Sequence, residues 1–104
     1  MIFDRDHLAR YTSGDAALEA ELFGLLRDQT QRCVAAMEAA ADPDAWKAAA
    51  HTLKGAARGV GAFALGEACQ RAEEAPQAAW PVAVIEVRRA ADAAVAEIET
   101  ILSR

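Results

Sequence analysis

No apolar run in this sequence approaches the roughly 20 residues that a helix needs to cross a bilayer. The first residues, MIFDRDHLAR, also lack the basic-then-apolar pattern of a signal peptide. An excess of positive charge is missing as well, because the formal net charge is −5 at pH 7. These absences argue against a membrane protein and a general nucleic-acid-binding surface, and we expect a cytoplasmic protein.

The sequence also has few residues suited to disulfide or metal chemistry. Its two cysteines, Cys33 and Cys69, lack CxxC spacing and fall in apolar helical patterns, which predicts buried reduced thiols. Neither these cysteines nor His7 lie at ligand spacing from the second histidine, His51, so we expect no metal and no cofactor. A glycine-rich nucleotide-binding box is absent too, and 104 residues leave no space for an ATP-binding kinase domain beside a helical bundle.

What the sequence does contain is alanine and a helical rhythm. Hydrophobic residues make up 54% of the chain and charged residues 26%, which is typical of a folded globular protein. The apolar residues recur every three or four positions, so we expect one all-α domain over residues 1–104.

Capping residues, prolines and glycines divide the chain into five expected helices. The first expected helix is short, begins at about Asp4 and includes Leu8. The second is long, runs from Ala16 to Ala41 and is capped by Ser13 or Asp15. The third runs from Asp42–Pro43 to Arg58, the fourth from Gly61 to Ala75, and the fifth begins at Pro81. Gly59 is the expected left-handed residue that ends the third helix. Four substantial helices with short connections predict an antiparallel four-helix bundle with a short extra N-terminal helix.

Each long helix has an expected buried stripe. In the second it comprises Leu18, Leu22, Leu25, Leu26, Cys33 and Met37; in the fourth, Ala62, Leu65, Cys69 and Ala72; in the fifth, Val84, Val87, Ala91, Ala94, Val95, Ile98 and Leu102. We expect Trp46 and Trp80, beside helix starts, to be packing anchors. Phe63 lies off its helix's stripe, which leaves open a partly exposed position near His51.

The segment AHTLKGAARGVG, Ala50 to Gly61, carries the least ordinary pattern. On a helical wheel the apolar residues gather opposite His51: Trp46, Ala49, Ala50, Leu53, Ala57 and Val60. One side of His51, here the cationic flank, holds Lys47, Lys54 and Arg58. The other side, here the bare flank, holds Ala48, Gly55 and Gly59. His51 is therefore expected to be exposed between a charged surface and nearly bare backbone.

Gly55 needs an explanation, because glycine destabilises a helix interior by roughly 1 kcal/mol relative to alanine. A surface helix that only meets solvent gains nothing from it, whereas a partner that must bring a phosphate close to His51 gains clearance. Neutral imidazole is a good nucleophile near pH 7. Neighbouring cations would stabilise a phosphoryl group attached to it. The pattern favours a phosphoryl-accepting histidine.

The stretch AHTLKGAARGVGAFALGEACQRAEE resembles the signature of histidine phosphotransfer (HPt) domains, the intermediates of bacterial phosphorelays. The matching residues are His51, Leu53, Lys54, Gly55, Gly61, Leu65, Cys69 and Glu73, and the motif covers about a quarter of the chain.

The resemblance implies that His51 is phosphorylated on Nε2 by the aspartate of a receiver domain and passes the group to another receiver. Lys54 would help to hold the phosphate and Gly55 would give clearance, while Arg58 is an addition suggested by this sequence's own geometry. Magnesium in such relays is bound by the receiver. Gln70 and Glu73, on the neighbouring helix, could reach His51 or have plain surface roles.

The expected protein is thus a free-standing, monomeric phosphoryl carrier and not an enzyme, with receiver domains of response regulators or hybrid histidine kinases as partners. A helical-bundle adaptor that binds a signalling partner is the alternative, although it would not explain the glycine beside the histidine. A dimeric kinase-derived phosphotransferase would need a second domain. A hydrolase would need a further acid or base near His51 and a pocket.

Overall fold

A computed structural model describes residues 4–103. The helices are α1 (Arg5–Thr12), α2 (Ala16–Ala39), α3 (Pro43–Gly59), α4 (Phe63–Glu74), the short 3₁₀ helix η1 (Gln77–Ala79) and α5 (Trp80–Leu102). No strand occurs in this part of the chain. The predicted all-α bundle with a short extra N-terminal helix is confirmed.

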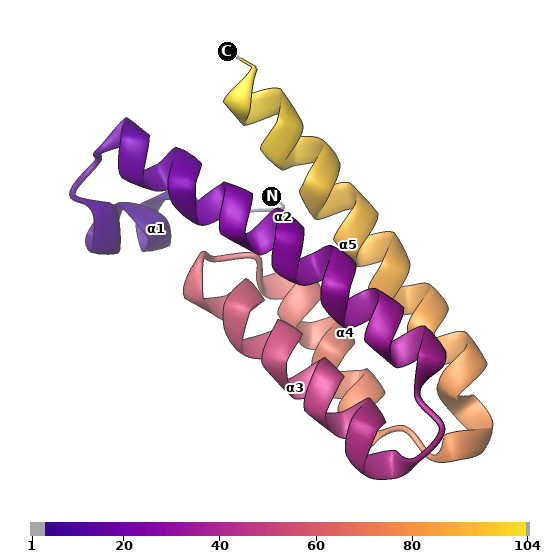
Figure 1. Ribbon diagram of the computed structural model, residues 1–104. Helices are drawn as coiled ribbons and strands as arrows, with labels where there is room; N and C mark the ends of the chain where they lie inside the picture. The colour runs from indigo at the N-terminus through magenta and orange to yellow at the C-terminus, as the bar shows by residue number, and fades with distance from the viewer. Residues whose placement is uncertain (1–3, 104) are drawn as a thin grey trace.

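The four long helices form a ring in which each contacts two neighbours: α2 packs on α3 and α5, and α4 packs on the same two helices. Figure 1 shows α2 and α5 running past the shorter α3 and α4, so that their far ends diverge and the molecule is elongated, 42 × 22 × 20 Å. The short α1 folds back beside the start of α2 (Figure 1). Within residues 4–103, no helix combines the length and apolar character that crossing a membrane requires.

Aspartates begin three of the helices. Asp42 accepts a hydrogen bond from the backbone N–H of Ala45 at 2.9 Å, with Pro43 at the first position of α3, as the sequence predicts. Of the two candidates for the α2 cap, Asp15 is correct, because its carboxylate accepts from two backbone N–H groups at the start of α2. Ser13 instead ends α1 in the left-handed conformation, with φ of 52°. These caps satisfy backbone donors that a helix start leaves unpaired.

The expected stripe of α2 is partly wrong. Leu18 and Leu25 are 37% and 58% exposed, and Leu22 is only partly buried. The buried residues are Phe23, Leu26, Thr30, Cys33, Val34 and Met37. Both sets recur at helical spacing, so periodicity alone could not decide which stripe faces the core. The position of α2 between α3 and α5 decides it, and it leaves the leucines beside α3 near the surface.

The expected stripes of the last two helices are largely correct. All four core residues expected in α4 are buried: Ala62, Leu65, Cys69 and Ala72. In α5, Val87, Ala91, Ala94 and Ile98 are buried and Val84 and Val95 are partly buried. The prediction that Leu102 is buried is wrong, since 36% of it is exposed at the end of a helix that extends beyond its neighbours. The buried cysteines are both free, as predicted, and burial raises the pKa of the Cys69 thiol to about 12.

Trp46 joins three helices at one end of the bundle. Its ring is 2% exposed, and its indole N–H donates to the carbonyl oxygen of Ala72 in α4 at 2.7 Å. It also stacks on Trp80 at the start of α5, with centroids 4.6 Å apart and planes 7° from parallel. The two tryptophans are packing anchors, and they fix how the start of α3 lies against the end of α4.

The end of α3 differs from the expectation, because the left-handed residue is Gly61 and not Gly59. Gly61 has φ of +82°, and the N–H of Ala62 bonds to the carbonyl of Ala57 at 2.8 Å, which closes the helix end. A Cβ on Gly61 would lie 2.8 Å from the carbonyl oxygen of Asp4. Gly59 stays helical, and the space around it is open.

This difference predicts opposite effects of two alanine substitutions. Gly61→Ala should destabilise the fold by more than ~2 kcal/mol, because the left-handed conformation alone costs an L-residue roughly 1–2 kcal/mol and the methyl group meets backbone. Gly59→Ala should leave stability unchanged or raise it by up to about 1 kcal/mol. Urea unfolding of both variants measures this. Equal stabilities would contradict the assignment of the helix end.

Candidate functional site

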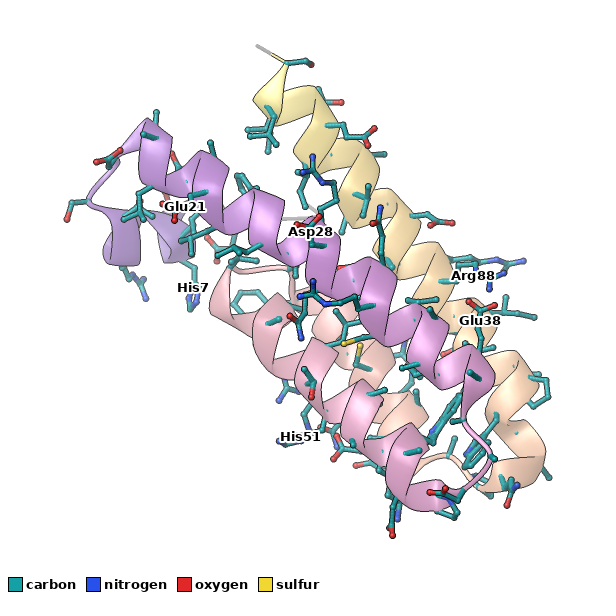
Figure 2. All side chains as sticks on the ribbon, viewed as in Figure 1. His7, Glu21, Asp28, Glu38, His51 and Arg88 are labelled. Atoms are coloured by element: carbon teal, nitrogen blue, oxygen red, sulfur yellow. The ribbon has the colours of Figure 1, made fainter. Side chains whose placement is uncertain are left out.

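His51 lies in the middle of α3, with its side chain outside the core. Its neighbours Ala50 and Leu53 are fully buried, whereas the His51 side chain is 69% exposed. Figure 2 shows it on the outer surface of α3, across the molecule from the ion pair between Glu38 and Arg88. The wheel-based prediction of its direction therefore agrees with the structure.

Glu73 of α4 joins His51 to Lys54. One carboxylate oxygen, Oε1, lies 3.3 Å from His51 Nδ1, and the other, Oε2, lies 2.5 Å from Lys54 Nζ. Lys54 also donates to Gln70 Oε1 at 3.0 Å. Its side chain is only 13% exposed, because it lies along the α3–α4 contact and does not extend into solvent. The predicted histidine and lysine thus meet through a glutamate that the sequence left without a definite role.

The charges in this cluster hold the carboxylate ionised. The hydrogen bond from Lys54 lowers the pKa of Glu73 below its usual value, against an opposing effect of burial, and the Lys54 charge and the His51 ring lower it further. The cluster therefore places an ionised carboxylate between the Lys54 side chain and the His51 ring.

The same contact decides which ring nitrogen can react. A carboxylate beside Nδ1 favours the tautomer with the proton on Nδ1, since only an N–H can donate to it. Nε2 then keeps its lone pair, and it lies on the opposite side of a ring that is 69% exposed. The arrangement can present a nucleophilic nitrogen to a partner.

The residues of the cationic flank lie in different surroundings, which their sequence positions do not show. Lys47 is exposed and lines a groove of about 500 Å³ with Gln70, Glu73 and Glu74. Arg58 lies across α4: an added Cβ on Gly66 would be 3.0 Å from Arg58 Cγ and 3.4 Å from Nε. Gly66 therefore lets the arginine stem pack on the helix. Gly66, like Gly55, is a glycine in the middle of a helix. That position was the sequence signal that could have identified the contact between Arg58 and Gly66.

The bare flank is open, as expected. Added Cβ atoms on Gly55 and Gly59 would have no atom within 4 Å, and Ala48 is exposed. No packing inside this fold therefore requires Gly55 to be glycine. Beside it, α2 and α3 form a shallow groove of about 190 Å³ lined by Leu22, Leu25, Leu26, Gln29, Ala56 and Val60.

Phe63 does not belong to this site. It is the first residue of α4, 41% exposed, and it meets the ring of His7 edge to face at 5.2 Å. Glu73 is ten residues further along the helix, roughly 15 Å away. Within residues 4–103, no group of three or more His, Cys, Asp or Glu side chains could hold a metal ion.

The chain is similar to known proteins in both sequence and structure. The Hpt domain family matches residues 21–100 of the chain. Among solved structures, the chain is similar to that of histidine phosphotransferase ShpA from Caulobacter crescentus, with 37% sequence identity and a TM-score of 0.79. The similarity covers 99% of this chain and 92% of that chain. No curated protein matches the chain.

The position of Glu73 predicts the tautomer of His51. Above the pH at which the ring loses its charge, ¹⁵N chemical shifts should identify Nδ1 as the protonated nitrogen and Nε2 as the free one. Glu73→Leu removes the acceptor and should abolish this preference while the fold persists, because Glu73 is outside the apolar core. A ring that carries its proton mainly on Nε2 in the parent protein would contradict the proposed hydrogen bond.

Proposed function

Because the chain belongs to the Hpt domain family, we propose that it carries a phosphoryl group on His51 Nε2 between receiver domains of a phosphorelay. Members of the family act as phosphocarriers and not as kinases. For this chain we propose the same: a carrier that takes the group from one receiver aspartate and delivers it to another.

The single observation that carries the proposal is the ring of His51, exposed on one edge and held by Glu73 on the other. A histidine on a surface without a function needs no partner at Nδ1. Here the partner is an ionised carboxylate from another helix, and Lys54 lies within the same cluster. A nucleophile with an orienting group and a nearby cation is what phosphoryl acceptance needs.

In the proposed transfer, the Nε2 lone pair attacks the phosphorus of a receiver's aspartyl phosphate. The P–N bond forms as the bond from phosphorus to the aspartate oxygen breaks, and the electron pair of that bond leaves on the aspartate as a carboxylate. The proton on Nδ1 stays in place, so the ring gains positive charge beside Glu73. Delivery is the reverse reaction with a second receiver's aspartate as nucleophile.

We propose that the receiver approaches over the bare flank. The backbone at Gly55 and Gly59 leaves space there, and the leucines that α2 leaves at the surface adjoin it: Leu25 is 58% exposed and Leu22 lines the groove beside Ala56. Apolar residues beside a hydrophilic nucleophile suit a protein partner, since their burial would favour docking. The cationic flank would then face the phosphoryl group from the other side.

The first test is phosphorylation of His51. Incubation with a phosphorylated receiver should label the parent with a group that is stable in alkali and labile in acid, as a phosphoramidate is. His51→Ala should fold normally, because the side chain is exposed, and should take no label. Incubation with ATP alone should label neither protein.

Three outcomes would overturn the assignment. Label on His51→Ala would place the acceptor elsewhere, and robust labelling of pure protein by ATP would indicate a kinase. Binding of the receiver without any transfer would support the adaptor alternative.

The second test separates the two flanks. Gly55→Gln should slow transfer at least tenfold by obstructing the receiver, although stability should be unchanged or slightly higher, because glutamine favours helix more than glycine does. Lys47→Gln places the same side chain at an exposed position on the other flank and should have little effect. Transfer rates and thermal midpoints are measured together. Parent-like transfer by Gly55→Gln would refute the clearance argument, and loss of activity only through unfolding would make Gly55 a packing residue.

A further inference from the structure

We propose that Arg58 is a specificity-determining residue that binds an acidic side chain of the receiver domain and does not hold the phosphoryl group. Gly66 positions it by letting the arginine stem lie across α4. This inference rests on the proposed function, because it concerns the surface that the receiver covers.

The first step concerns the distance between Arg58 and the reacting histidine. Arg58 lies seven residues after His51 on α3, a rise of roughly 10 Å. A Cβ on Gly66 would be 3.0 Å from Arg58 Cγ and 3.4 Å from Nε, so the arginine stem lies beside Gly66. Gly66 is in turn seven residues before Glu73, the residue that contacts His51. Lys54, which pairs with the same glutamate, is the cation that belongs to the reacting cluster.

The second step concerns how firmly Arg58 is held. Gly66 is buried in the middle of α4, where glycine is less favourable than alanine. Its missing Cβ leaves the space that the arginine stem occupies. An arginine whose stem is already packed loses less rotamer freedom when its guanidinium meets a partner. Gly66 therefore prepares Arg58 for binding, at the expense of helix stability.

The third step concerns charge. Arg58 is exposed, and no carboxylate in the described part of the chain forms an ion pair with it. Lys47, exposed on the same side of α3, differs because it lines a groove together with Glu73 and Glu74. The guanidinium of Arg58 can accordingly take a carboxylate from outside the chain, and its planar fork suits two parallel hydrogen bonds to one.

The fourth step concerns the area that a receiver covers. Seven residues turn a helix through about 700°, so Arg58 and His51 point in directions only about 20° apart. A standard interface buries about 800 Å² on each partner, which corresponds to a disc of roughly 16 Å radius. A receiver centred over His51 therefore also covers Arg58, roughly 10 Å away. Towards the edge of an interface, charge governs the rate of association and the choice of partner.

Arg58→Gln tests the assignment with a phosphorylated receiver that labels the parent protein. The receiver concentration that gives half-maximal transfer should rise about fivefold at low salt, the upper range for one exposed charge pair. Added salt should reduce the difference. The maximal transfer rate and the lifetime of the phosphohistidine should stay within about twofold of the parent, because no contact with the phosphoryl group is lost.

Arg89→Gln is the matched control, since it removes the same charge from an exposed position on α5, across the ring of helices from α3. It should leave the half-maximal concentration unchanged, and an equal rise there would overturn the proposal. A lower maximal rate or a shorter phosphohistidine lifetime in Arg58→Gln would also overturn it, because Arg58 would then contact the phosphoryl group. A lower thermal midpoint with unchanged transfer would reduce Arg58 to a cation at a helix end.

Gly66→Ala tests the positioning. The added methyl group should displace the arginine stem and raise the half-maximal concentration about threefold, while the thermal midpoint stays unchanged or rises. In an Arg58→Gln background the same substitution should have no further effect on transfer. An equal further rise in that background would refute the link between the two residues. Failure of the parent to accept any phosphoryl group would instead refute the proposed function, so the two failures are distinguishable.

Discussion

The packing of α3 against α4 is the constraint on which the site depends. At one end the indole of Trp46 donates to the carbonyl of Ala72 in a buried hydrogen bond. Further along, Lys54 reaches Glu73, and beyond it Arg58 lies across Gly66. The two helices are thereby fixed in both spacing and register. A shift of one turn, about 5.4 Å, would separate Glu73 from His51.

This contact also explains why one surface of α3 is crowded and the other is open. Towards α4, long side chains fill the space between the helices and bond to its acceptors. Towards α2, glycines leave the backbone uncovered, and the neighbouring groove is apolar. His51 lies at the boundary between the two. In the proposed function, this asymmetric environment gives the receiver one direction of approach and keeps the charged groups on the other side of the ring.

The charges of the two ionised side chains beside His51 nearly balance each other. Lys54 and Glu73 form an ion pair that is mostly shielded from solvent, with 13% and 24% of their side chains exposed. A lone cation beside His51 would hold a phosphate strongly, and a lone carboxylate would exclude it. Their pairing gives an intermediate field, which suits the proposed function, in which the phosphoryl group arrives and leaves again.

Much of this protein follows from its sequence alone. Aspartates and Pro43 mark the helix starts because capping is local chemistry, and the direction of His51 follows from the 3.6-residue repeat of a helix whose other side is apolar.

Tertiary structure decided the rest. Leu25 and Phe23 both fit a helical stripe, and only the placement of α2 between two neighbours exposes the first and buries the second. Gly59 and Gly61 are both plausible helix ends, and only the contact of Gly61 with Asp4 and its positive φ distinguish them. Glu73 lies 22 positions after His51, and the packing register of α3 on α4 brings the two within 3.3 Å, which helical periodicity cannot specify because it describes one helix at a time.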